Sequence, residues 1–97
     1  MTDDFLRNIK VNVAFLAADA IDIHFGVTNA TLQEANTKKI ALSNSNFKVL
    51  VADHTKIGKM SFAKVADLSE FDVVIMDSGV DEDDAREISK KTELVLV

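Results

Sequence analysis

Three polar segments follow apolar runs in this sequence, and they hold the side chains best suited to binding chemistry. The segments are Asp19 to Asn29, Asp53 to Lys56, and Asp77 to Gly79. Carboxylates and amides accept hydrogen bonds from hydroxyl groups, whereas an ammonium or a small hydroxyl can donate to an anion. These residue types suit a polar ligand that carries hydroxyl or phosphate groups.

The composition restricts the class of protein. The 97 residues are 47% hydrophobic and 28% charged, which is typical of one folded domain or one lobe of a larger one. The chain has no cysteine, and its two histidines lack a His or Cys neighbour at metal spacing, so we expect no disulfide, no metal and no cofactor. A formal charge of −5 argues against a DNA-binding face in this chain.

The apolar runs are far too short to span a bilayer. The acidic start at Thr2 to Asp4 leads into no long apolar stretch, so we expect no signal peptide. These features, with the absence of cysteine, favour a cytoplasmic protein.

Four apolar segments are nearly continuous runs, which is typical of strands buried on both faces of a sheet. The predicted strands are Asn12 to Ala17, Phe47 to Ala52, Asp72 to Met76 and Glu93 to Val97. The segment Met60 to Ala66 is either a short strand or irregular.

Two helices are predicted between these strands. The first covers Leu32 to Ser43, because Thr31 to Glu34 has the form of a capping box. Its inner face should carry Leu32, Ala35 and Leu42. The second opens at the acidic residues Asp81 to Asp84, which complement the helix dipole.

Alternating strands and helices predict a parallel sheet with helices packed on its faces. Ligands of such sheets bind beyond the carboxyl ends of the strands. The three polar segments follow predicted strands, so their loops can converge on one crevice.

The order and spacing of several motifs resemble the C-terminal sensor domain of DeoR-type transcriptional regulators. The resemblance begins near residue 10 and is strongest for repressors of lactose phosphotransferase systems. It implies an α/β fold of the ribose-5-phosphate isomerase-like type, a parallel sheet with flanking helices, and a regulatory protein that is not an enzyme. The motifs are Ala17-Ala18-Asp19-Ala20-Ile21-Asp22, Gly26-Val27-Thr28-Asn29, Glu34 with Lys38, Ala52-Asp53-His54-Thr55-Lys56-Ile57-Gly58, and Asp77-Ser78-Gly79.

The resemblance also implies an effector site for a phosphorylated sugar, with tagatose 6-phosphate as the natural candidate. Asp19 and Asp22 would face sugar hydroxyls, and Lys56 would meet the phosphate. Turn capping competes with ligand contact for the aspartates, and simple solvation competes for the lysine. The expected effector-binding residues are Asp19, Asp22, Gly26, Thr28, Asn29, Glu34, Asp53 and Lys56.

The same motifs are similar to ribose-5-phosphate isomerase, and by that likeness Glu34 would occupy the place of the catalytic base. However, Leu16 stands where the isomerase motif has its first Asp, so the catalytic set is incomplete. Glu34 also suits the capping box. The alternatives to a sensor are thus an isomerase-like enzyme and an interaction domain that binds no ligand.

The family's N-terminal winged helix-turn-helix and the first half of its sensor have no counterpart in these residues. We therefore expect residues 1–97 to form a single partial domain, the C-terminal part of an effector-binding domain. Operator DNA would be contacted only through the missing domain. An incomplete sheet leaves open an edge and an apolar face that the missing half would cover, which predicts a homo-oligomer. We also expect this chain alone to bind the effector weakly or not at all, whereas the full-length protein should bind it measurably.

Overall fold

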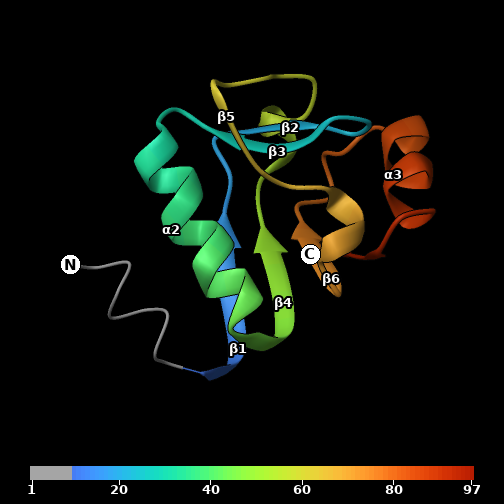
Figure 1. The fold of residues 1–97 in the computed structure, drawn as a ribbon. Coiled ribbons are helices and arrows are strands. Elements are labelled where there is room, and N and C mark those ends of the chain that lie inside the picture. The colour runs from blue at the N-terminus through green and yellow to red at the C-terminus, as the bar shows by residue number, and fades with distance from the viewer. Residues whose placement is uncertain (1–9) are drawn as a thin grey trace.

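A computed structural model gives the fold, and it describes residues 10–97. Strands alternate with helices along most of the chain (Figure 1). The elements are β1 (Val11–Ala17), β2 (Ala20–Asp22), β3 (Gly26–Asn29), α2 (Leu32–Ser43), β4 (Ser45–Val51), the 3-10 turn η1 (His54–Lys56), β5 (Ala63–Ala66), the 3-10 turn η2 (Leu68–Glu70), β6 (Val73–Met76), α3 (Glu82–Ser89) and β7 (Glu93–Leu96).

The four predicted strands form one sheet in the order β1-β4-β6-β7, and every neighbouring pair is parallel. The predicted parallel sheet with flanking helices is therefore confirmed. In register, Ala17 pairs with Val51, and Val51 pairs with Ile75. The carboxyl ends of β1, β4 and β6 consequently lie at the same edge of this main sheet.

A second sheet, β2-β3-β5, is antiparallel and was not predicted. The segment Asp19 to Asn29 was interpreted as a polar loop, but most of it is a hairpin. Gly26 has φ of +121°, and a Cβ there would lie 2.4 Å from the carbonyl oxygen of Ala66. Glycine is therefore needed where β3 passes closest to the chain after β5. The ambiguous segment before residue 66 ends in β5.

Helix α2 has the predicted bounds, and Thr31 is its N-cap with the Oγ1 accepting from the Glu34 N–H at 3.1 Å. Ala35 and Leu42 are buried as expected, but Leu32 is 60% exposed, so its assignment to the inner face was wrong. Leu32 is the first residue of the helix, where the core no longer covers it. Its side chain is therefore exposed, although it lies on the same side of the helix as Ala35 and Leu42. In α3, Asp81 is the N-cap and accepts from the Asp83 N–H.

The hydrophobic core lies on one face of the main sheet. Both helices, the second sheet and η2 contribute to it, through Ala35, Ile88, Ile21 and Leu68 among others. Each connection between parallel strands moves one position further in the same direction across the sheet. Because such crossovers are right-handed, they all pass over the same face. In the part of the chain from residue 10 onward, no helix is long and apolar enough to cross a membrane.

Candidate functional site at the carboxyl edge of the main sheet

Aspartates stand just beyond three neighbouring strands of the main sheet. Asp19 follows β1 by two residues, Asp53 follows β4 by two residues, and Asp77 directly follows β6. Because these strands are adjacent and parallel, the three carboxylates belong to one edge, as predicted.

The carboxylate beyond β1 belongs to a hydrogen-bond network that joins three elements. Asp19 Oδ2 accepts from Asn29 Nδ2 at 3.0 Å and from the Ala30 N–H at 3.1 Å. The Lys38 ammonium of α2 donates to Asn29 Oδ1 at 3.2 Å and to the Ala17 carbonyl at 2.6 Å. These contacts use two of its three donors, so one N–H remains for a ligand.

Lys38 was not among the expected site residues. Its position four residues after Glu34 was part of the motif, and that spacing was the available signal. The sequence could not show that its ammonium reaches the end of β1, because a lysine side chain can extend in many directions.

The turn after β4 brings together His54, Asp53 and Asp77. Asp77 Oδ1 accepts from the His54 backbone N–H at 2.7 Å, and its Oδ2 lies 2.6 Å from His54 Nδ1. Gly79 N–H also donates to Oδ2, at 3.1 Å. This contact fixes the orientation of the imidazole ring, so its Nε2 is the nitrogen left for another partner. The His54 side chain is exposed.

Hydrogen bonds lower the pKa of both Asp53 and Asp77. The pKa of Asp77 lies below its ordinary value, chiefly because the His54 backbone N–H bonds to the ionised carboxylate. The pKa of Asp53 is lowered mainly by the Thr55 hydroxyl and then by the Thr55 N–H. Both groups are therefore carboxylates at neutral pH and act as acceptors.

Lys56 ends η1 and is half-buried, and its positive charge helps to lower the pKa of Asp53. It therefore lies in the same turn as Asp53. Together Lys38 and Lys56 supply cationic donors to an edge that otherwise presents acceptors.

The other expected residues do not all reach this edge with free groups. Thr28 is fully buried in β3, and its Oγ1 accepts from the Ser61 N–H at 2.8 Å. Asp22 Oδ1 accepts from two backbone N–H groups, those of His24 and Phe25, in the β2–β3 turn. Gly26 begins β3 after that turn.

Glu34 takes the structural role that competed with ligand contact. Its Oε1 lies 3.1 Å from the Thr31 hydroxyl at the start of α2. Of the eight expected residues, the structure thus gathers Asp19, Asn29, Asp53 and Lys56 around the carboxyl edge. It places Asp22, Gly26, Thr28 and Glu34 in turn, strand or helix-capping positions.

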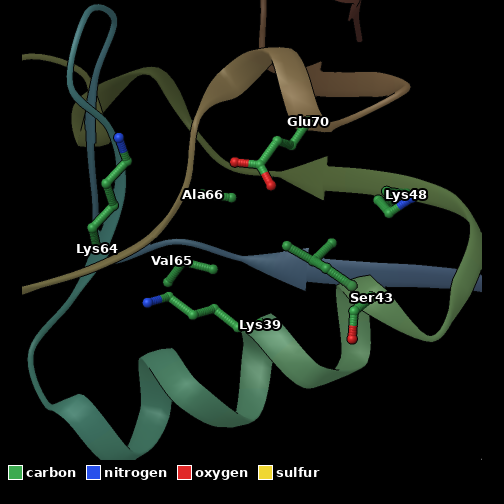
Figure 2. A pocket seen from close by; sticks show the side chains of 8 residues that line it. Lys39, Ser43, Lys48, Lys64, Val65, Ala66 and Glu70 are labelled. Atoms are coloured by element: carbon green, nitrogen blue, oxygen red, sulfur yellow. The ribbon is translucent and has the colours of Figure 1, made fainter.

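A separate hollow of about 380 Å³ lies between α2, β4 and β5 (Figure 2). Lysines line its rim together with Glu70, whose carboxylate faces the interior (Figure 2). The Lys64 side chain points away from it, toward Phe25, with the ammonium 4.8 Å from the ring centroid. Within residues 10–97, no group of three His, Cys, Asp or Glu residues could hold a metal ion.

Comparison with known proteins identifies relatives of this chain. The chain is 34% identical over 86 residues to the HTH-type transcriptional regulator GlpR of Haloferax volcanii, which is 89% of this chain and 34% of that protein. It is 38% identical over 77 residues to the lactose phosphotransferase system repressor of Staphylococcus aureus, covering 79% of this chain and 30% of that protein. The deoxyribose operon repressor of Escherichia coli is 38% identical over 72 residues, 74% of this chain and 29% of the repressor.

The chain thus spans about a third of the length of these relatives. The model of the DeoR C-terminal sensor domain matches residues 1–78, which is most of the sequence. This chain belongs to the DeoR C-terminal sensor domain family.

Proposed function

We propose that this chain is the effector-sensing part of a DeoR-type transcriptional repressor and that its carboxyl edge contacts a phosphorylated sugar. The observation that carries the proposal is that one edge of a parallel sheet holds two cationic side chains together with carboxylates. Lys38 bonds the Asn29 amide that also bonds Asp19, and the charge of Lys56 acts on Asp53. Asp19 and Asn29 stand beside the first lysine, and Asp53 beside the second.

The chemistry of these groups matches the two halves of a sugar phosphate. Ionised Asp19 and Asp53 accept hydrogen bonds from sugar hydroxyls. The third donor of Lys38 and the ammonium of Lys56 supply charge-assisted bonds to phosphate oxygens, which are about twice as strong as neutral ones. Acceptors beside donors thus favour a ligand that has both hydroxyls and an anionic group.

The names of two relatives support a sugar as the ligand, since they are repressors of lactose phosphotransferase and deoxyribose systems. Tagatose 6-phosphate is the first effector to test. In this proposal the chain is a partial sensor of a cytoplasmic repressor, and operator DNA is bound through a separate winged helix-turn-helix domain. The net charge of −5 supports that separation.

A regulatory role is favoured over an isomerase because of Glu34. An isomerase mechanism needs this carboxylate as a base beside the bound sugar. In the structure Glu34 bonds to Thr31 at the first turn of α2.

Ligand-induced stabilisation tests the proposal. A ligand that binds only the folded chain raises the free energy of unfolding, by about 1.4 kcal/mol at ten times its dissociation constant. We expect tagatose 6-phosphate at millimolar concentration to raise the unfolding midpoint of the full-length protein more than tagatose or inorganic phosphate alone. Equal midpoints with all three additives would contradict the proposal. A rise with phosphate alone would show an anion site without sugar recognition.

A further inference from the structure

The imidazole of His54 is held in one orientation at the carboxyl edge, and the proposed function gives it no role. His54 lies in the turn after β4, the strand that stands between β1 and β6 in the main sheet. Asp53 precedes it and Lys56 follows two residues later. A ligand that contacts these two neighbours therefore also lies near the imidazole ring.

Asp77 determines which ring nitrogen carries the proton. Its Oδ2 lies 2.6 Å from Nδ1 of His54, and the backbone N–H groups of His54 and Gly79 donate to the same carboxylate at 2.7 and 3.1 Å. The two backbone donors favour the ionised carboxylate, which can only accept hydrogen bonds. Nδ1 must therefore donate in the contact with Oδ2. In the neutral ring, Nε2 then carries no proton and presents a lone pair.

Gly79 leaves the space that the ring occupies. A Cβ at this position would lie 2.7 Å from both Nδ1 and Cε1 of His54, and 2.8 Å from Oδ2 of Asp77. The backbone does not itself require a glycine here, since only Gly26 and Gly58 have a positive φ. The absence of a side chain at Gly79 thus serves the contact between imidazole and carboxylate.

Stability alone does not account for this arrangement. The side chains of His54 and Asp77 are 44% and 40% exposed, and pairs between exposed groups contribute little to stability. The backbone N–H of His54 already ties the turn to Asp77. Among residues 10–97, no hydrogen bond to Nε2 of His54 is found, so this nitrogen is available to a ligand.

A lone pair on Nε2 selects the ligand group that it can bind. A phosphate dianion has no hydrogen to donate, whereas a sugar hydroxyl has one. We propose that Nε2 of His54 accepts a hydrogen bond from a hydroxyl of the sugar phosphate, with Asp77 and Gly79 as positioning residues that hold the ring for this contact. The inference rests on the proposed function. It assigns His54 to the sugar half of the ligand, while Lys38 and Lys56 contact the phosphate.

Titration of the full-length protein with tagatose 6-phosphate tests the contact. His54→Ala should weaken binding about three- to tenfold, the effect of one neutral hydrogen bond. The matched control is His24→Ala, which removes the other histidine, exposed in the β2–β3 turn, and should bind like wild type. Equal affinities of His54→Ala and wild type would overturn this inference and leave the proposed function standing. A wild type that does not bind would overturn both.

Asp77→Asn tests whether Asp77 acts through the ring. The amide group is similar in size but can donate to Nδ1, which moves the ring proton to Nε2 and removes the acceptor. This variant should bind tagatose 6-phosphate as weakly as His54→Ala, and so should Gly79→Ala, whose new Cβ displaces the ring. The double variant of Asp77 and His54 should bind no more weakly than either single variant. Additive losses would contradict the positioning role.

The chemical shifts of the ring nitrogens give a readout that a merely structural role would not move. In the full-length protein, isotope-labelled at histidine, the His54 signals are those absent from His54→Gln. Mildly alkaline buffer keeps imidazole neutral. Wild type should then show a protonated Nδ1 and an unprotonated Nε2, with and without saturating tagatose 6-phosphate, and Asp77→Asn should show the reverse. A proton on Nε2 of wild type would overturn the proposal and would make the ring a donor to phosphate.

Discussion

Lys38 connects helix α2 to the candidate site, because its ammonium donates hydrogen bonds both to the Ala17 carbonyl at the end of β1 and to the Asn29 amide oxygen. We predict that Lys38→Ala weakens binding of a sugar phosphate about tenfold to a hundredfold, since one charge-assisted hydrogen bond is worth about 1.5–3 kcal/mol. Lys39→Ala is the matched control, one residue along α2 at an exposed position on the rim of the separate hollow. Equal affinities for the two variants in a titration would remove Lys38 from the site.

Lys56 supplies the second cationic donor, and its substitution gives an independent prediction. We expect Lys56→Ala to weaken sugar-phosphate binding by a similar factor of about ten to a hundred. Lys59→Ala removes an exposed lysine three residues later and should leave the affinity unchanged. Removal of a solvated lysine has little effect on binding or stability. A binding midpoint equal to that of wild type would therefore show that Lys56 is solvated and touches no ligand.

Asp77 gives a prediction about stability and pH. Its pKa is lowered in the folded state by backbone and side-chain hydrogen bonds, the His54 N–H first, so the unfolded state binds its proton more readily. The resulting stabilisation is fully present above about pH 4, the ordinary aspartate range, and is lost as the pH falls through the lowered value. Asp77→Asn should therefore differ most from wild type at neutral pH and converge toward it in acid. Denaturant unfolding at a series of pH values measures the free energy of unfolding of both proteins. A constant difference between wild type and variant at every pH would contradict the prediction.

Among the elements, the β2–β3 hairpin depends on a single glycine. We predict that Gly26→Ala destabilises the fold by more than the roughly 1–3 kcal/mol that a strained backbone alone costs, because the new Cβ also meets the Ala66 carbonyl. Gly58→Ala is the matched control. Its φ is +83° with no atom within 4 Å of the added Cβ, so it reports the backbone strain alone. Equal losses of unfolding free energy would show that the close approach is relieved by a small shift.

The elements also show what could be predicted from sequence. Helix α2 and the four parallel strands were recognisable because a capping box and long apolar runs are strong local signals. The hairpin was missed because β2 has three residues and β3 has four, too few to show the alternation of apolar and polar residues that indicates a strand. Thr28 and Asn29 were interpreted as polar turn residues, yet they are buried, because they lie in β3, the central strand of the second sheet. Such burial depends on pairing with β5, far along the chain.

The candidate site divides in the same way. The position of Asp19, Asp53 and Lys56 after strands was visible in the sequence, since strand ends fix which side of a parallel sheet a loop occupies. The contact between Asp77 and His54 links residues 23 positions apart and required the fold. Asp22 and Glu34 were equally suited to capping and to ligand contact, and their hydrogen bonds in the structure are capping bonds.

In the molecule as a whole, one sheet separates two different surfaces. The helices, hairpin and core occupy one face, while the other is open (Figure 1). The candidate effector site lies at neither face but at the carboxyl edge between them. A ligand can shift an assembly only if its affinity differs between two states, so any coupling would pass through the strand ends shared by both surfaces.

The most direct test of the account is an amide NMR titration of this chain with tagatose 6-phosphate, up to tens of millimolar. The account predicts that chemical-shift changes concentrate at the carboxyl edge, on Asp19, Asn29, Asp53 and Lys56. The lysine-lined hollow around Lys39 should remain unaffected. Shift changes confined to that hollow would contradict a sugar-phosphate site at the carboxyl edge.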